Sequence, residues 1–262
     1  MPTLTRRQVQ RYGWVPDLPD HRDLLYAAPP SPKPIPARTD LRRGMPPVYD
    51  QGELGSCTGN AIAAAVAFAR AKEKKPPFTP SRLFIYYNER VIEGTVDQDS
   101  GAQIRDGMKA VAKLGVTSES DPGRPYDWPY DIARFTQKPP AACYTFAARN
   151  QVLVYRRLPQ IISQLRGCLA SGFPFVFGFT VYDGFESAEV ARTGVVNLPA
   201  TGEKVVGGHA VVAVGYDDAA QRFVVRNSWS RKWGMKGYFT MPYAYLTDDN
   251  LAADLWTVRI VE

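Results

Sequence analysis

The sequence predicts an α+β protein whose two lobes face each other across a cleft. Its composition, 45% hydrophobic and 22% charged over 262 residues, is ordinary for a folded protein. Helix-like runs crowd the first half of the chain, whereas short β-branched and aromatic runs separated by turn residues fill the second half. Because this segregation favours separate helical and β regions, we expect a helical lobe over about 45–140 and a β-rich lobe over about 141–262.

Residues 1–34 are predicted to be an N-terminal extension of different character. The segment is rich in proline, and the run "PPSPKPIP" that overlaps its end is typical of an extended chain. Six of its residues are large and favour burial: Tyr12, Trp14, Leu18, Leu24, Leu25 and Tyr26. We therefore expect an extended strap that packs on the rest of the protein. Two placements are open, one at or near the cleft and one on the back of a lobe.

Four helices are predicted after the extension. The first begins at Cys57, continues through the alanine-rich run "CTGNAIAAAVAFARAKEKKPP" and is ended by Pro76 and Pro77. The second lies in "FTPSRLFIYYNERVIEG", with Thr79 as its N-cap, Pro80 at its first position and Gly94 at its end. The third lies in "GAQIRDGMKAVAKLG", where Gly115 is the expected C-cap, and the fourth in "LPQIISQLRGCLASG".

Four strands are predicted in the second half, in "FPFVFGFTVY", "HAVVAVGYDD", "RFVVRNSW" and "KGYFTMPYAY". His209 stands at the start of the second of these strands. Asn227 stands at the end of the third, after a turn around Asp217 and Asp218. If these neighbouring strands pair in antiparallel fashion, the imidazole and the amide lie close together.

Charge and cysteine content exclude several classes of function. The net charge is +6, but the basic residues are scattered in pairs, so we expect no nucleic-acid partner. No apolar run is long enough to span a membrane, and the N-terminus lacks the apolar core of a signal peptide. We expect a soluble protein, either cytoplasmic or exported without a classical signal. Three cysteines and two histidines form no metal-binding pattern, so no metal is expected.

Cys57 has three possible roles: a buried small hydrophobic residue, half of a disulfide, or a nucleophile at the mouth of a helix. It follows the small-residue turn "GELGS" and begins the alanine-rich helix. The free amides and dipole of a helix N-terminus favour a thiolate, and a nearby imidazolium favours it further. A core cysteine is the simplest interpretation of Cys57 alone. Together with His209 and Asn227, however, it forms the set that a nucleophilic thiol requires.

Three blocks, "QGELGSC", "GGHAVVAVGY" and "NSWSRKWGMKGYF", resemble the signature blocks of the papain-like cysteine peptidases of family C1, in the same order. The resemblance runs from about Ile35 to the C-terminus. It implies a papain-like fold with the active site between the lobes. Cys57 resembles the nucleophile, His209 the base and later acid, and Asn227 the residue that orients the imidazole. Gln51 resembles the glutamine that stabilises the oxyanion together with the backbone N–H of Cys57.

The resemblance also implies substrate-binding residues. In "DSGAQI", Gly101 would pair with extended substrate backbone, and Ser100 lies beside it. Gly208, just before the histidine, is a further candidate. Trp229 resembles the indole that shields the Asn–His hydrogen bond from water, at the edge of the substrate site.

The family's pattern is not fully kept. Thr58 follows the nucleophile where tryptophan is usual, Ser230 replaces a glycine after "NSW", and Leu54 stands where secreted members carry a disulfide cysteine. These departures leave every catalytic atom in place and suggest a divergent, bacterial-type branch.

The resulting hypothesis is a monomeric cysteine endopeptidase that cleaves peptides or proteins through a thioester, without cofactor or metal. We expect residues 1–34 to restrain it, as a prosegment does in a zymogen, or to brace it. Two alternatives remain: a Cys–His acyltransferase of transglutaminase type, and a non-catalytic binding module that kept the fold.

Overall fold

Seven strands form one antiparallel sheet within the residues that the computed structural model describes, 12–28 and 34–261. The order is β2-β7-β3-β4-β5-β6, and β1 pairs with β4. The strands are β1 (Arg38–Asp40), β2 (Val152–Arg157), β3 (Phe175–Tyr182), β4 (Val205–Asp217), β5 (Arg222–Arg226), β6 (Tyr238–Pro242) and β7 (Ala252–Val261).

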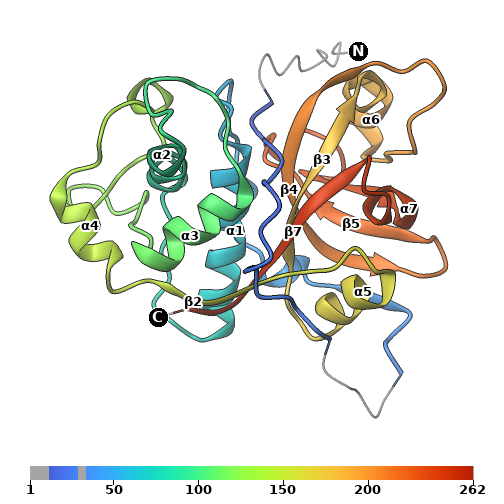
Figure 1. Ribbon diagram of the computed structural model, residues 1–262, viewed down its shortest axis with the longest axis horizontal. Helices are drawn as coiled ribbons and strands as arrows, with labels where there is room; N and C mark the ends of the chain where they lie inside the picture. The colour runs from blue at the N-terminus through green and yellow to red at the C-terminus, as the bar shows by residue number, and fades with distance from the viewer. Residues whose placement is uncertain (1–11, 29–33, 262) are drawn as a thin grey trace.

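Four helices gather beside the sheet and form a second lobe (Figure 1): α1 (Cys57–Lys72), α2 (Arg82–Glu93), α3 (Ile104–Lys113) and α4 (Ala141–Ala147). The helices α5 (Ile162–Ala170), α6 (Ala188–Thr193) and α7 (Tyr243–Thr247) lie with the strands. Three 3₁₀ turns complete the described elements: η1 (Arg42–Gly44), η2 (Ile132–Arg134) and η3 (Asp183–Glu186). The predicted α+β fold with two lobes is confirmed. Helix α4 lies just past the expected border at 140, yet its Cys143 and Ala147 pack into the helical lobe.

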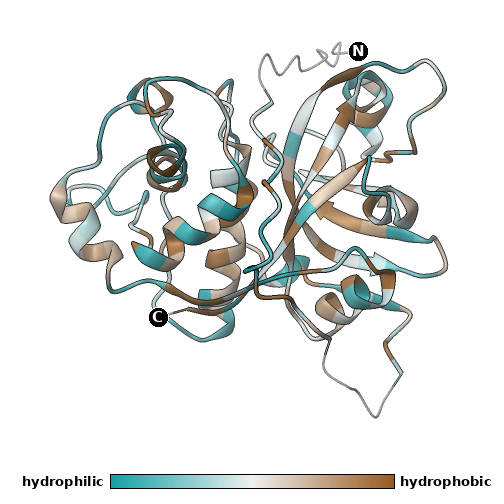
Figure 2. Ribbon diagram, viewed as in Figure 1, coloured by the Kyte–Doolittle hydropathy of each residue, from teal (hydrophilic) through white to brown (hydrophobic). Residues whose placement is uncertain are grey.

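Helix α1 lies against the sheet because its buried face is made of small residues. Cys57, Ala61 and Ala65 share one hydrophobic core with Ala210 on β4 and Trp256 on β7. Alanine adds little bulk, so the helix backbone comes close to the strands. Figure 2 shows hydrophobic residues along the central strands and on the helix faces turned toward them.

Local sequence signals set the helix ends, with three corrections. Helix α1 ends at Lys72, before the predicted end at Pro76 and Pro77. The N-cap of α2 is Ser81, whose hydroxyl accepts a hydrogen bond from the Phe84 amide at 3.1 Å, so the prediction of Thr79 was two residues early. Gly94 ends α2 in the left-handed region, at φ 71°, as glycine readily does. The C-cap of α3 is Leu114, and Gly115, at φ 81°, follows it, so the prediction of Gly115 as the C-cap was one residue late.

Strands β1, β2 and β7 and helices α4, α6 and α7 were not predicted from the sequence. Their segments are short or lack a clear hydrophobic period, and tertiary contacts decide their structure. The longest of them, β7, joins β2 to β3 within the sheet. No helix in the described ranges is long and apolar enough to cross a membrane.

The N-terminal strap, defined here as residues 12–28, runs between the two lobes (Figure 1, dark blue). The expectation that all its large residues are buried was wrong. Trp14 and Tyr26 are 9% and 6% exposed, whereas Leu18, Leu24 and Leu25 are 63–70% exposed. The remainder of the predicted extension, residues 1–11 and most of the proline-rich run (29–33), lies outside the described residues.

Candidate active site

Cys57 is the first residue of α1 and is fully buried. The turn before it is fixed from the helical lobe, because both carboxylate oxygens of Asp99 accept hydrogen bonds from the Gly55 amide, at 3.0 and 3.1 Å. Tyr86 donates its hydroxyl to Asp99 at 2.6 Å. The thiol is therefore held at a positive helix terminus by a turn with little freedom.

His209 lies on β4 and is hydrogen-bonded to Asn227, which follows β5. Its Nε2 is 2.9 Å from Asn227 Oδ1, and the same oxygen accepts the Ser228 amide at 2.8 Å. Because that atom accepts a backbone N–H, it is the amide oxygen, and Nε2 carries the proton. In the neutral ring Nδ1 is then the basic nitrogen. The predicted contact between the two residues is confirmed, but the prediction that His209 starts its strand was wrong, because β4 begins at Val205.

Aromatic rings enclose the His209–Asn227 pair. The Trp229 ring lies 5.0 Å from the imidazole centroid, and Phe179 and Phe185 lie at 5.8 and 6.5 Å. Trp229 is 1% exposed. A hydrogen bond surrounded by apolar rings is stronger than the same bond in water.

Cys57 of the helical lobe and His209 of the sheet lie next to each other where the two lobes meet. The amide of Ala210, the residue after His209, donates a hydrogen bond to the Cys57 sulfur. Burial raises the pKa of the Cys57 thiol to about 12, although the amides of Ala210, Gly13 and Thr58 act in the opposite direction. With the strap in place, the thiol is therefore protonated at neutral pH.

The Gln51 side chain lies beside the nucleophile's turn. Its Oε1 accepts the Ser228 hydroxyl at 2.6 Å, and its Nε2 donates to the Leu54 carbonyl at 3.0 Å. These two bonds direct the amide nitrogen toward the loop before Cys57. An amide nitrogen carries two hydrogens, so one bond to Leu54 leaves a second N–H for an oxyanion.

The strap occupies the cleft above Cys57. The Gly13 carbonyl accepts the Ala102 amide at 2.7 Å, and the Trp14 amide donates to the Gly208 carbonyl at 3.0 Å. The Val15 amide donates to the Ala102 carbonyl at 3.1 Å. Backbone groups of the strap thus bridge the helical lobe and the sheet.

The four predicted substrate-binding residues take different positions. The Gly208 carbonyl accepts a hydrogen bond from the amide of strap residue Trp14. The Trp229 ring lies 6.2 Å from the ring of strap residue Tyr12. Gly101, at φ 73°, lies against the Gly13 backbone, but the backbone that pairs with the strap belongs to Ala102. Ser100 is exposed, and its hydroxyl donates a hydrogen bond to the Thr95 hydroxyl, so the structure does not bring it to the strap.

Comparison with known proteins agrees with this geometry. The sequence profile described as papain family cysteine protease matches residues 35–250. The chain belongs to the papain family of cysteine proteases. It is similar to xylellain, a cysteine protease from Xylella fastidiosa, with 44% identity, a TM-score of 0.85 and 96% of each chain covered.

Two further relatives support membership of the papain family. A peptidase C1-like protein of Acanthamoeba polyphaga mimivirus is 43% identical over 96% of this chain and 88% of its own. A cathepsin B-like protein of Giardia intestinalis is 30% identical over 81% of this chain and 70% of its own. The chain is therefore a papain-like cysteine peptidase, and it acts on peptides or proteins.

Glu89, a buried acid that contacts the residue after the nucleophile, was not predicted from the sequence. Thr58, which stands where this family usually has tryptophan, donates its hydroxyl to Glu89 Oε2 at 2.7 Å. Glu89 is fully buried, and burial raises its pKa to about 8 although the Thr58 hydrogen bond opposes this. The position of Glu89 within α2 gave no signal, because one charged residue in a helix usually faces solvent.

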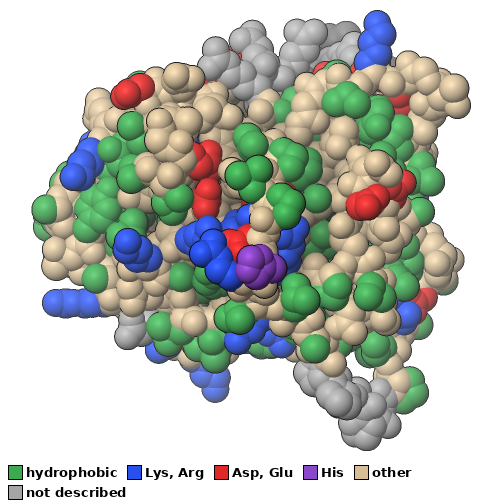
Figure 3. All heavy atoms as spheres, in the orientation of Figure 1, with side chains coloured by type: hydrophobic (Ala, Val, Ile, Leu, Met, Phe, Trp, Pro, Cys, Tyr) green, Lys and Arg blue, Asp and Glu red, His purple; other side chains and the backbone are tan. Residues whose placement is uncertain are grey.

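The surface around the strap is strongly charged. Figure 3 shows Lys and Arg side chains gathered over the middle of the face that the strap crosses, with acidic side chains among them. Strap residues Asp20 and Arg22 line a hollow here together with Arg105 and Lys109 of α3. No group of three His, Cys, Asp or Glu in the described ranges is arranged to hold a metal.

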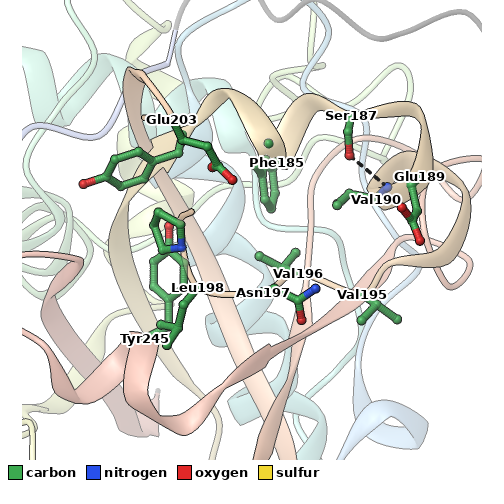
Figure 4. A pocket seen from close by; sticks show the side chains of 13 residues that line it. Phe185, Ser187, Glu189, Val190, Val195, Val196, Asn197, Leu198, Glu203 and Tyr245 are labelled. Carbon is green, nitrogen blue, oxygen red and sulfur yellow. Dashed lines mark hydrogen bonds between the residues drawn. The ribbon is translucent and has the colours of Figure 1, made fainter. Parts of the chain in front are cut away.

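A separate pocket of about 260 Å³ lies in the strand-rich lobe, and Phe185 is one of the residues that line it (Figure 4). Its lining includes Tyr245, Glu189, Asn197 and Leu198. Phe185 also contacts the His209 and Trp229 rings, so this side chain takes part in both the pocket lining and the surroundings of the catalytic pair.

We predict that Glu89→Gln alters how stability depends on pH. An acid whose pKa is raised by folding stabilises the fold fully below its ordinary pKa, and this contribution is lost as pH rises through about 8. The Tm of the wild type should therefore fall more steeply between pH 6.5 and 9 than that of Glu89→Gln. Exposed Glu53→Gln is the matched control and should follow the wild type. Parallel curves for wild type and Glu89→Gln would contradict the assignment.

Proposed function

We propose that the chain is an endopeptidase that acts through a thioester and that its N-terminal strap restrains it. The observation that carries the proposal is the strap backbone, which bonds Ala102 and Gly208 on opposite sides of Cys57. Every proposed catalytic group comes from one chain, so we propose that it works as a monomer. Membership of the papain family favours this function over acyl transfer or a purely binding role.

The geometry supports a two-step hydrolysis. The Cys57 thiol loses its proton to His209 Nδ1, and the thiolate attacks the carbonyl carbon of the peptide bond. The Cys57 amide and Gln51 Nε2 stabilise the resulting oxyanion. His209 then protonates the leaving amine, and a thioester forms. In the second step His209 removes a proton from water, the hydroxide releases the acyl group as a carboxylic acid, and the thiol is restored.

Two features support endopeptidase activity and the restraint. An internal segment of the chain, with residues on both sides of it, occupies the cleft, so the cleft accommodates the middle of a chain rather than only its end. The sulfur is fully buried with this segment bonded beside it, and burial raises the pKa of the Cys57 thiol. Departure of the strap would expose the thiol to solvent and lower its pKa.

Charged residues anchor the strap beyond the cleft. Asp23 accepts hydrogen bonds from Arg105 of α3 at 2.7 Å and from Arg157 of β2 at 2.9 Å. Asp17 accepts the Arg105 amide at 3.0 Å and the Trp256 indole at 2.9 Å. These bonds are mostly shielded from solvent, so each resists screening by salt better than a surface pair would.

Turnover should depend on Cys57 and His209 as a unit. Either Cys57→Ala or His209→Ala should remove nearly all cleavage of a peptide amide, and the double variant should be little worse, because each group acts through the other. Steady-state kinetics on a fluorogenic peptide measures this effect. Cys143→Ala and Cys168→Ala are the matched controls and should remain active. Full activity in His209→Ala would refute the mechanism.

Gly13→Ala should displace the strap. A Cβ at Gly13 would lie 1.6 Å from the Gly55 carbonyl oxygen, which is fixed by the turn before Cys57. We expect kcat/KM on small peptides, and the rate of Cys57 labelling by the epoxide E-64, to rise by about tenfold, the effect of weakening docking by roughly 1.4 kcal/mol. Exposed Leu24→Ala is the control and should behave as wild type. If Gly13→Ala folds and both rates stay unchanged, the strap is a brace and not a restraint.

The restraint should weaken as pH rises. Burial and the nearby Asp254 charge raise the pKa of Asp17 to about 7, so docking is strongest below the ordinary pKa of 3.8 and is weakened as pH rises through about 7. Although burial opposes it, hydrogen bonds from Arg105 and Arg157 keep the pKa of Asp23 low, so Asp23 stays ionised in this range.

The measurement is the ratio of kcat/KM between Gly13→Ala and wild type. The pH dependence of catalysis itself cancels in this ratio, because the two proteins share one active site. We expect the ratio to fall at least about threefold from pH 5 to pH 8, since one pKa unit corresponds to a factor of ten in docking. A ratio that is constant or rises with pH would contradict the role of Asp17.

A further inference from the structure

The hydroxyl of Tyr130 joins the two ends of the turn that carries the proposed oxyanion donors. Tyr130 lies in the loop before η2 and donates its hydroxyl to the Gln51 carbonyl at 2.9 Å. The Ser56 hydroxyl lies 2.5 Å from the same phenol oxygen. Because the phenol has a single proton and gives it to Gln51, Ser56 is the donor of the second bond. One oxygen atom therefore links the glutamine of the oxyanion site to the residue before the nucleophile.

The separation of the two oxyanion donors depends on this turn. Gln51 supplies Nε2 at its start, and Cys57 supplies its backbone N–H at its end. An oxyanion donor is effective at about 2.7–3.1 Å, so both groups must keep their places at once. Asp99 holds the middle of the turn through the Gly55 amide, and Tyr130 holds its two ends.

The Ser56 hydroxyl is oriented from inside the helical lobe. Asn60 Nδ2, in α1, donates to the Ser56 hydroxyl at 3.1 Å and to the Ser56 carbonyl at 2.9 Å. Asn60 Oδ1 accepts a hydrogen bond from Arg82 Nη1 at 3.1 Å, which fixes the end of the amide that faces Ser56. The Ser56 oxygen is thus an acceptor for Asn60, and its proton is directed to Tyr130.

Arg82 also fixes the ring of Tyr130. Its guanidinium lies 3.8 Å from the centre of the Tyr130 ring and 4.7 Å from that of Tyr49. An ion pair with Glu119 at 2.9 Å, and a bond to the Asp50 carbonyl at 3.1 Å, hold the guanidinium in place. Arg82 is buried. The phenol oxygen therefore has a defined position before any substrate binds.

We propose that Tyr130 is a positioning residue for catalysis, which sets the distance between Gln51 Nε2 and the Cys57 amide by tying Gln51 to Ser56. The proposal rests on the thioester hydrolysis proposed above. Donors that are fixed before the oxyanion forms need no reorganisation during the reaction. Without the phenol hydroxyl the two ends of the turn relax independently, and displaced donors stabilise the transition state less while substrate binding is unaffected.

Tyr130→Phe in the full-length chain tests the role, because phenylalanine keeps the ring on Arg82 and removes the hydroxyl alone. We expect kcat on a fluorogenic peptide to fall about tenfold with KM unchanged, a smaller loss than removal of a whole oxyanion donor. Tyr144→Phe is the matched control, since it removes a hydroxyl of the same lobe that bonds Asn88 at 3.2 Å, and it should keep the wild-type kcat. A wild-type kcat in Tyr130→Phe would overturn the proposal.

Ser56→Ala interrupts the same link at its other bond. This variant should also lower kcat at constant KM. The double variant with Tyr130→Phe should be no slower than the slower single variant, because a link that is already broken is not broken twice. Losses that multiply in the double variant would mean two independent effects and would overturn the proposal.

Alkylation of Cys57 by iodoacetamide separates the oxyanion site from the nucleophile. The thiolate displaces iodide at a saturated carbon, so no oxyanion forms and neither donor is needed. Tyr130→Phe should therefore keep the wild-type alkylation rate, read at Cys57 by mass spectrometry of the digested protein. A fall in this rate that matches the fall in kcat would place the damage at the thiol and overturn the proposal.

A peptide trifluoromethyl ketone tests the same role without turnover. The Cys57 sulfur adds to its carbonyl carbon, the thiol proton passes to His209, and the carbonyl oxygen becomes an oxyanion between the two donors. Its Kd should rise about tenfold in Tyr130→Phe, equivalent to roughly 1.4 kcal/mol, and stay unchanged in Tyr144→Phe. This result without any peptide cleavage by the wild type would refute the proposed hydrolysis and leave the role of Tyr130 standing. Cleavage by the wild type, with equal Kd in wild type and Tyr130→Phe, would overturn the role of Tyr130 alone.

Discussion

The active site depends on the close contact between α1 and the sheet. The nucleophile begins α1 in one lobe, and the histidine lies on β4 in the other, so neither lobe alone holds the pair. Small side chains such as Ala61 and Ala65 let the helix approach the strands until the Ala210 amide reaches the Cys57 sulfur. A larger residue on this face would separate the two lobes at the point where proton transfer takes place, since close-packed interiors do not absorb extra volume.

The same contact makes the thiol sensitive to whatever lies above it. The hydrophobic core lies beneath the Cys57 sulfur, so solvent can reach the sulfur only from the cleft. The strap covers this side. Gly13 comes close enough to do so because it meets the backbones of Gly55 and Gly101. A covering segment with side chains at this point would lie farther out and leave water beside the sulfur. Proximity of backbones, rather than apolar area, therefore sets the burial of the thiol.

The sequence predicted the features that depend on neighbouring residues. It did not predict those that depend on contacts between distant parts of the chain. The start of helix α1, the placement of His209 and Asn227 on neighbouring strands, and the division into lobes follow from periodicity and turn residues. The exposure of Leu18, Leu24 and Leu25 does not, because tertiary contacts and not local sequence decide which side chains of the strap are covered. Three hydrogen-bonded contacts join residues distant in sequence, and no spacing rule connects them. They are Asp99 with Gly55, Thr58 with Glu89, and Ala102 with the strap backbone.

Asp254 anchors the strap to the sheet. It is a buried acid on β7, and its oxygens accept hydrogen bonds from the Trp14 indole, the Asp17 amide and Arg157. Two of these three donors belong to the strap. A strap residue 14 without an N–H donor would leave the Oδ2 atom of Asp254 with one bond fewer in a buried place, and the strap would dock more weakly. The strength of the proposed restraint therefore depends on the match between residue 14 and this single acceptor, and not on the apolar area that the strap covers.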